Sequence, residues 1–279
     1  MVSTSITIDF ERAPAKIQQR SPEYRMSMEA IALPEIAQKV VPFALPSVSV
    51  VIPTLNEAKN LPWLLPRMPA WISEIIIVDG RSTDNTLAVA LSERPDVRIV
   101  TETAPGKGAA LRAGFAAASG DIVVMLDADG SMDPDEIILF VGALMAGADF
   151  AKGSRFIQGA GTEDMSLFRM IGNWGLTLAV RLLYGGSFSD LCYGYIAFWR
   201  KHAALFQGEH NGFEIETLMN VRALKSGLKV VEVASFEANR LFGESNLRAI
   251  PDGWRVLKAI LRERLTPTGQ PDFFEQRLT

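Results

Sequence analysis

The sequence predicts an α/β fold in which helices cover both faces of a mainly parallel central sheet. Its 279 residues are 48% hydrophobic, enough to bury a large core. From Ser47 onwards, short apolar runs alternate with segments of helical length, and this alternation is typical of right-handed β-α-β crossovers. The run at residues 123–126 is continuously apolar, as expected of a strand that is covered on both faces.

The elements follow one another in a regular order. Prolines interrupt residues 1–46, so this part is expected to be an N-terminal extension before a single domain at 47–265 and a tail at 266–279. Strands are predicted at 47–53, 74–79, 97–101, 121–127, 148–154, 192–200 and 229–238. Helices are predicted near 57–69, 83–93, 107–118, 134–147, 166–186 and 213–226.

Composition excludes several classes of protein. A formal charge of -4 gives no basic face for nucleic acid. One cysteine and two histidines exclude an internal disulfide and a zinc site of the Cys/His type, and they fit a reducing, cytoplasmic setting. The longest uncharged stretches are shorter than the roughly 20 residues that cross a bilayer, so we expect a soluble or peripheral protein.

Carboxylates are concentrated at the end of one predicted strand, in "VVMLDADGSMDP". Ligands of open α/β sheets bind at the carboxyl edge, and acids gathered there repel one another unless a cation relieves them. A helix start at residues 133–136 explains Asp133 but leaves Asp127 and Asp129 without a structural role. We therefore predict that Asp127 and Asp129 bind a divalent cation.

Polar residues also end the neighbouring strands. "VVIPTLNEAKNL" ends with Pro53, Asn56 and Glu57, "IIIVDGRSTDNT" contains Asp79, and "PGKGAALRAG" offers Lys107 between two glycines. Each of these stretches alone also suits a turn or a helix cap. Together they describe a nucleotide pocket, because an acid can accept from a base and the glycine-rich turn allows close approach of a phosphate.

These blocks resemble, in their order, the inverting family 2 glycosyltransferases, whose GT-A fold is a Rossmann-like nucleotide-diphospho-sugar transferase fold. Within that family the chain is most similar to the dolichyl- and polyprenyl-phosphate hexose (mannose or glucose) synthases, from Ser47 to about Leu247. The resemblance implies that Asp79 meets the nucleobase. It also implies that "LDADG" is a DXD motif, in which Asp127 and Asp129 hold Mg²⁺ or Mn²⁺ on the donor diphosphate.

Later blocks resemble the acceptor side of the same family: "GSRF", "DLCYGYIAFWR", "GFEIETL" and "RLFGESNL". By resemblance they make Arg155, Asp190, Glu214, Glu216, Arg240 and Ser245 site candidates, with Arg240 and Ser245 on the donor side. A hydroxyl acceptor needs a general base, for which Asp190 or Glu216 is the candidate. A phosphate acceptor is already anionic and needs an arginine, for which Arg155 is the candidate. Lys107 and Arg240 are expected to neutralise the leaving diphosphate.

Three departures from the family pattern bear on these expectations. Gly80 follows Asp79 where many relatives carry a second acid, so recognition of the base rests on Asp79. Ser131 stands where the synthases usually have a glutamine, which removes a third protein ligand for the metal. The stretch at 192–196 replaces the usual acceptor-side core.

The expected activity is metal-dependent transfer of a hexosyl group from a UDP- or GDP-hexose to polyprenyl phosphate, peripherally at the cytosolic face of a membrane. The alternatives are the same chemistry on a soluble sugar, a phosphoacid or a glycan, or a non-catalytic nucleotide-sugar-binding protein. The predicted helix at 166–186 has a broad apolar face. That face either packs in the core or lies in the lipid interface, and a lipid acceptor favours the interface.

Overall fold

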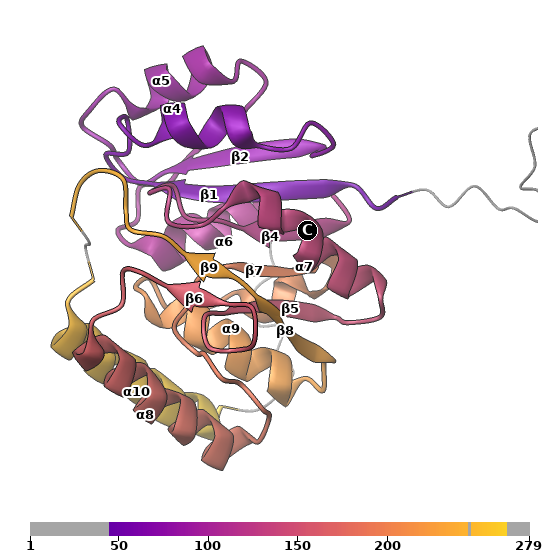
Figure 1. Ribbon diagram of the computed structural model, residues 1–279, viewed down its shortest axis with the longest axis vertical. Coiled ribbons are helices and arrows are strands. Elements are labelled where there is room, and N and C mark those ends of the chain that lie inside the picture. Colours follow the sequence, from indigo (N-terminus) through magenta and orange to yellow (C-terminus); the bar gives the residue numbers. More distant parts are fainter. Residues whose placement is uncertain (1–44, 245–246, 267–279) are drawn as a thin grey trace, which may run out of the picture. The chain divides into compact units, whose positions relative to one another are not determined.

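A seven-stranded sheet organises the computed structural model, which describes residues 45–244 and 247–266 (Figure 1). The strand order is β3-β2-β1-β4-β7-β5-β8, in which β7 is antiparallel to both neighbours and all other pairs are parallel. The α/β class and the mainly parallel sheet are thus confirmed. The strands are β1 (Val48–Thr54), β2 (Glu74–Asp79), β3 (Arg98–Thr101), β4 (Ile122–Met125), β5 (Phe150–Ser154), β7 (Ile196–Trp199) and β8 (Val230–Ala234).

The helices agree with the predicted pattern except at two places. The helix predicted at 57–69 is wrong in extent, because Pro62 and Pro66 lack backbone donors; the segment forms only α4 (Leu61–Leu64) and the 3-10 turn η2 (Leu65–Arg67). The pattern also missed α10 (Ala249–Leu265), whose start is fixed by Asp252 accepting from the backbone of Arg248 at 2.7 Å. The other helices are α5 (Thr86–Glu93), α6 (Lys107–Ala117), α7 (Ile137–Met145), α8 (Leu167–Tyr184) and α9 (Glu214–Lys225), with 3-10 turns η3 (Pro134–Glu136) and η4 (Arg200–Phe206).

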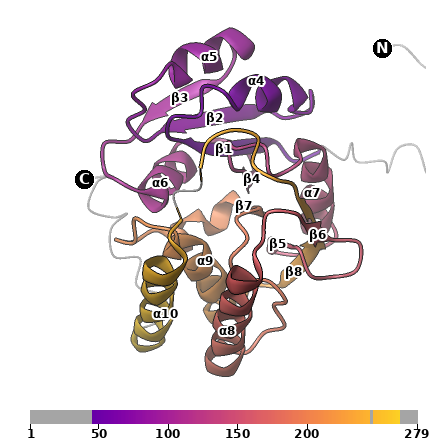
Figure 2. The ribbon, with the colours of Figure 1, turned by 60° about the vertical axis from the view of Figure 1, so that its left-hand side comes forward.

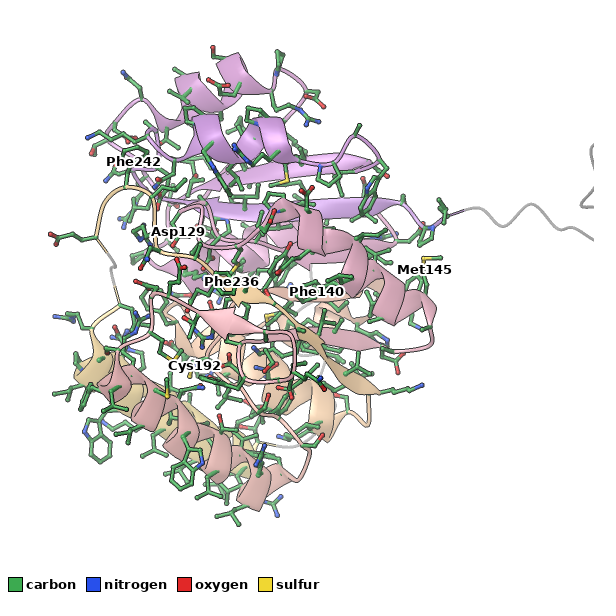
Figure 3. All side chains as sticks on the ribbon, viewed as in Figure 1. Asp129, Phe140, Met145, Cys192, Phe236 and Phe242 are labelled. Atoms are coloured by element: carbon green, nitrogen blue, oxygen red, sulfur yellow. The ribbon has the colours of Figure 1, made fainter. Side chains whose placement is uncertain are left out.

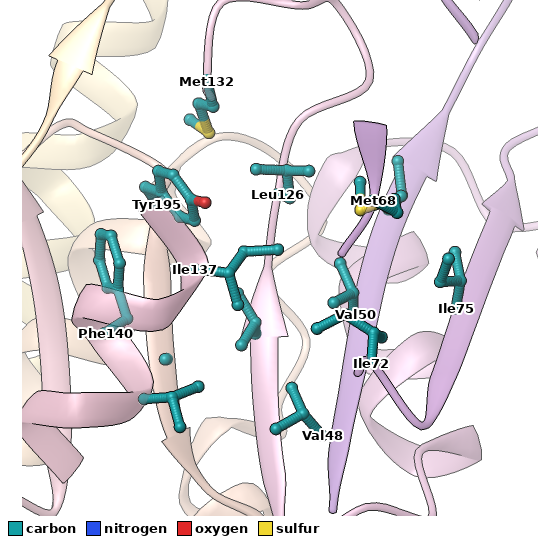
Figure 4. Close-up of a cluster of buried hydrophobic side chains, with 14 of the residues drawn as sticks. Val48, Val50, Met68, Ile72, Ile75, Leu126, Met132, Ile137, Phe140 and Tyr195 are labelled. Carbon is teal, nitrogen blue, oxygen red and sulfur yellow. The ribbon is translucent and has the colours of Figure 1, made fainter. Parts of the chain in front are cut away.

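Two apolar layers cover the sheet, one on each face. Successive residues of a strand point to opposite faces, so Val50 and Ile77 pack beneath α4, α5 and α7, while Val51 and Ile76 pack beneath α6 and α9. Figure 4 shows the first layer, where Phe140 of α7 stacks on Tyr195 with ring centroids 4.3 Å apart. This double coverage explains why the strands are continuously apolar.

Helices α8 and α10 pack side by side against α9, away from the two main layers (Figure 2). A third, smaller apolar cluster joins them, and the Tyr184 hydroxyl of α8 donates to the carbonyl of Ile260 in α10. Their remaining apolar side chains face solvent, including Trp174 and Trp254, which are 65% and 60% exposed. None of the helices that the structure describes is long and apolar enough to span a bilayer.

A short two-stranded ribbon lies apart from the main sheet and directs the chain back to the edge where β1 and β4 end. It pairs β6 (Gly161–Thr162) with β9 (Phe236–Glu237). Beyond β9, Ala238 donates to the carbonyl of Ser131 and Leu241 to that of Asp129. The segment at 238–242 therefore lies directly against the acidic loop that follows β4.

Candidate functional site

A cleft of about 210 Å³ opens where the strand order reverses between β1 and β4. Chain connections leave these two neighbouring strands in opposite directions along the sheet, and such a switch point is where open α/β sheets bind ligands. Of the predicted donor-side residues, six line the cleft. Its walls are Pro53, Thr54, Leu55, Glu57, Gly80, Arg81, Gly106, Lys107, Ala110, Asp127, Ala128, Asp129, Phe213 and Arg240.

Asp79 lies at the end of β2 beside one end of the cleft. It is buried, and one carboxylate oxygen, Oδ2, accepts from the backbone N–H groups of Arg81 and Ser82 at 3.1 Å each. The other oxygen, Oδ1, is buried and has no hydrogen-bond partner among the residues that the structure describes. A buried acceptor without a partner costs free energy, so Oδ1 is suited to a donor group of a bound ligand.

Asn56 shapes the same end of the cleft without lining it. Its backbone is left-handed, with φ at 60°, and its side-chain oxygen accepts from the backbone N–H of Thr83 at 2.8 Å. Its own N–H donates to Ser82 at 2.9 Å. Asn56 thus ties the loop after β1 to the loop after β2, which holds the two walls at a set separation.

Lys107 joins two acids in the wall of the cleft. Its ammonium is 2.5 Å from Asp127 and 2.6 Å from Glu216, and its side chain is only 13% exposed. Burial acts to lower the pKa of Lys107, but the two carboxylates outweigh that effect and raise it. Burial raises the pKa of Asp127 to about 6, against the opposite effect of Lys107. An anionic Asp127 therefore depends on a cation beside it.

Asp129 has a cationic partner of its own. Its Oδ2 lies 2.8 Å from Arg240, which reaches Glu57 at 3.4 Å with its other nitrogen. Its Oδ1 accepts from the backbone and the hydroxyl of Ser131 at 3.0 and 2.7 Å. Figure 3 shows the segment that carries Arg240 passing over Asp129 towards Phe242, whose carbonyl accepts from Asn60. Both strand-end acids are thus balanced by cations from elsewhere in the chain.

The donor set suits a hard divalent cation only in combination with a ligand. Within residues 45–244 and 247–266, no group of three or more His, Cys, Asp or Glu side chains is arranged to hold a metal ion. Mg²⁺ is commonly held by one or two carboxylates together with substrate phosphates and water. Asp127 and Asp129 match that pattern, since both line the cleft and offer oxygen ligands. Asp133 instead caps η3, as the helix-start interpretation predicted.

Arg155 and Asp190 do not line the cleft but form a buried cluster at the end of β5. Asp190 is fully buried, and its oxygens accept from the Arg155 guanidinium at 2.7 and 2.9 Å and from Asn173 of α8 at 3.1 Å. Arg155 also pairs with Glu237 at 2.9 Å. Burial acts to raise the pKa of Asp190, but Lys152 and Arg155 hold it below its ordinary value. The geometry gives both residues the environment of structural ion pairs.

The remaining candidates are divided. Glu216 meets the cleft through Lys107, whereas Glu214 begins α9 and accepts from the backbone of Gly212 at 3.1 Å, outside the cleft. Ser245 lies outside the described residues. The cleft also includes Arg81 and Phe213, which we did not predict. Both stand inside quoted blocks, Arg81 two residues after Asp79 and Phe213 within "GFEIETL", so position beside a motif residue was the signal available.

Comparison with known proteins gives consistent matches. The model of glycosyl transferase family 2 matches residues 49–206. An uncharacterised glycosyltransferase of Mycobacterium tuberculosis is 34% identical over 231 residues, covering 76% of this chain and 98% of its own. A polyprenol monophosphomannose synthase of Mycolicibacterium smegmatis is 32% identical over 71% of this chain and 80% of its own.

Among solved structures, the chain is similar to glucosyl-3-phosphoglycerate synthase from Mycobacterium tuberculosis in complex with Mn²⁺, uridine diphosphate and glucosyl-3-phosphoglycerate. The TM-score is 0.61 and the sequences are 25% identical. The match covers 82% of each chain.

Proposed function

Because the chain belongs to glycosyl transferase family 2 and is a glycosyltransferase, we propose that it moves a hexosyl group from a nucleoside diphosphate sugar to a polyprenyl phosphate. The fold is the GT-A fold. The observation that carries the proposal is the pairing of two strand-end acids with two cations, Asp127 with Lys107 and Asp129 with Arg240, in one cleft. A diphosphate can replace the two carboxylates as the anionic partner of Lys107 and Arg240. A divalent cation can replace Lys107 and Arg240 as the cationic partner of Asp127 and Asp129.

Binding of the donor exchanges partners within the cleft. A bound diphosphate would draw Lys107 and Arg240 away from the carboxylates, and Asp127 and Asp129 would then be the residues that hold Mg²⁺ or Mn²⁺. Such a cation supplies Lewis-acid stabilisation of the leaving group. Lys107 and Arg240 would add positive charge where the nucleoside diphosphate departs. We thus assign Lys107 and Arg240 two roles: they pair with the strand-end acids, and they bind the diphosphate when the donor is present.

On the acceptor side, we assign different roles to the three candidates. Glu216 is the carboxylate in contact with Lys107 at the cleft, so a hydroxyl acceptor would use it as the general base. A phosphate acceptor needs no base, and Glu216 then positions Lys107. Asp190 and Arg155 satisfy each other, so we assign them the positioning of the loop at 190–195 against β5 rather than contact with the acceptor.

Direct assay separates this function from its nearest rival. Purified protein is incubated with radiolabelled UDP- or GDP-hexose, a divalent cation and polyprenyl phosphate, and product is extracted into organic solvent. Label in the organic phase is the expected result. The similar solved structure holds glucosyl-3-phosphoglycerate, which makes a soluble phosphoacid the second candidate acceptor. A parallel incubation replaces polyprenyl phosphate with phosphoglyceric acid, and label that appears there as a new aqueous phosphoacid glycoside, with none in the organic phase of the first incubation, would establish that rival.

The role of Asp79 gives a prediction on donor binding. Asp79→Ala removes the buried acceptor Oδ1, which we assign to a base N–H. We expect the donor KM to rise about tenfold with kcat nearly unchanged, since this contact is the same in ground and transition states. Steady-state kinetics with varied donor measures both constants. A fall in kcat at constant KM would remove Asp79 from base recognition.

The exposed face of α8 supports access to a lipid acceptor. Leu167, Ile171, Trp174, Leu178 and Leu182 lie at helical spacing and are all more than a third exposed. The sequence left two alternatives for this face, packing in the core or lying in the lipid interface. No part of the chain that the structure describes covers the face, so it does not pack in the core there. We propose that the face lies in the lipid interface, with α8 parallel to the bilayer surface.

Flotation with liposomes that contain polyprenyl phosphate tests this placement. The wild type should float, and Trp174→Glu/Leu178→Glu should lose about tenfold or more in vesicle binding, because two apolar side chains no longer leave water. Ile138→Glu/Leu139→Glu on α7 is the matched control, since both residues are about half exposed there. Wild-type protein that stays with the aqueous fraction, or an α8 variant that fails to fold, would refute the interface placement.

A further inference from the structure

Helix α10, which the sequence pattern did not predict, has three distinct faces: one inward, one apolar and exposed, and one basic and exposed. Its inward face carries Val256, Ala259 and Ile260 together with both of its acids, Asp252 and Glu263, which are 5% and 6% exposed. The acids are bonded inward, Asp252 to the helix start and Glu263 to Arg222 and Lys225 of α9. The solvent-facing side of α10 therefore carries cations without any exposed acid of its own.

The outward side is divided between apolar and basic residues. At 3.6 residues per turn, Ile250, Trp254, Leu261 and Leu265 form one exposed stripe. Arg255, Lys258 and Arg262, at spacings of three and four residues, form a second stripe beside it. The chain as a whole has a formal charge of -4, so this basic stripe is a local feature and not an effect of overall composition.

The basic stripe forms one wall of a groove of about 480 Å³, separate from the donor cleft. His210 and Glu214 line it from the start of α9 and the loop before it, whereas Trp254, Lys258 and Arg262 line it from α10. Arg255 is paired with Asp252 at 3.1 Å. In the described part of the chain, no carboxylate lies within 4.0 Å of Lys258 or Arg262, so these two cations have no internal counter-ion.

We propose that this groove binds the phosphate of an anionic lipid headgroup at a bilayer surface. Charge complementarity favours contact of the phosphate with Lys258 and Arg262, the lining cations that have no internal counter-ion among the described residues. A bilayer is the source of that phosphate because the apolar stripe runs along the same helix and Trp254 stands at its border, the position that tryptophan takes at membrane interfaces. The exposed side chains of α8 and α10 project outward together in Figure 3.

The groove is connected to the proposed reaction through one loop. Phe213 lines the donor cleft, while His210 and Glu214 on either side of it line the groove. Gly108, at the start of α6, donates to the Asn211 carbonyl at 2.8 Å, which anchors this loop. A headgroup in the groove would thus hold the cleft next to the bilayer. The inference rests on the membrane placement proposed above and adds to it a preference for anionic lipid.

Vesicles without polyprenyl phosphate provide the test. Binding of the full chain is measured to phosphatidylcholine vesicles and to vesicles that also contain phosphatidylglycerol. Lys258→Gln/Arg262→Gln should weaken binding to the phosphatidylglycerol vesicles about 30-fold, because each cation near an anionic surface contributes about 1 kcal/mol. Binding to phosphatidylcholine should be unchanged. Lys59→Gln/Lys201→Gln removes the same charge at exposed residues outside α8 and α10, and should change either binding less than about twofold.

The other results overturn the inference. Equal losses in the two double variants would mean a general charge effect. Stabilisation of the wild type by inorganic phosphate, lost in Lys258→Gln/Arg262→Gln without any lipid preference, would assign the groove to a free anion. A dimer that this variant converts to monomer would assign it to a second copy. Because no acceptor lipid is present, each of these results is independent of the transfer assay, whose failure would count against the proposed function instead.

Discussion

The Asp129→Asn variant is expected to lower kcat/KM by about 1000-fold or more. The substitution removes the charge that we assign to the divalent cation, and cation stabilisation of a leaving group contributes several kcal/mol to the transition state. It also frees Arg240, which then has Glu57 as its remaining partner. Transfer is measured with varied donor in the presence of Mg²⁺ or Mn²⁺, and the melting temperature is measured alongside to establish that the protein is folded.

Asp133→Asn is the matched control for this prediction. Asp133 belongs to the same loop and is exposed, but it caps η3 and does not line the cleft. Its replacement should leave kcat/KM within about twofold and cost at most about 1 kcal/mol of stability as a lost cap. Normal transfer by Asp129→Asn in excess chelator would end the metal assignment and with it the roles given to both strand-end acids.

The Asp190→Asn variant is expected to lower the free energy of unfolding by about 3–5 kcal/mol, the usual effect of breaking a buried ion pair. The change leaves the buried Arg155 guanidinium with Glu237 alone. Because the folded-state pKa of Asp190 is below its ordinary value, its stabilisation is complete at neutral pH and declines as pH falls through that lowered pKa. Urea unfolding at pH 7 and at acid pH measures both effects.

Asp164→Asn provides the comparison, since Asp164 pairs with Arg169 at 3.1 Å on the surface. Both side chains are about a third exposed, and such a solvated pair contributes little, so this variant should lose less than about 1 kcal/mol. The two variants differ in burial of the pair rather than in chemistry. If Asp190→Asn kept full stability but lost transfer, Asp190 would return as a candidate general base, the role that the sequence first suggested for it.

The sequence by itself determined the sheet and most of the donor-side residues. Apolar runs covered on both faces are continuous, so β1 to β5 were predicted within two residues of their observed bounds, and the carboxyl ends of parallel strands converge at one edge. The strands predicted at 192–200 and 229–238 were too long, because β7 begins only at Ile196 and β8 ends at Ala234. Pro53, Glu57, Lys107, Asp127 and Asp129 were predicted for this reason, and they line one cleft. Each signal is local, because it depends only on residues near one strand end.

Only the tertiary structure decided which charges meet. Each of three ion pairs joins residues that are far apart in the chain, and nothing in the sequence indicates which distant charge each residue meets. The pairs are Lys107 with Glu216, Arg155 with Glu237, and Asp129 with Arg240. The pairings show that Asp190 and Arg155 belong to a buried cluster and not to the cleft. The sequence alone did not make this distinction, because Asp190 and Arg155 stand in family motifs just as the cleft residues do. The same holds for α8 and α10, because an apolar stripe on a helix is identical in sequence whether another element covers it or solvent does. Burial depends on how distant segments pack, and that packing is set by the order of the strands rather than by any single stretch of sequence.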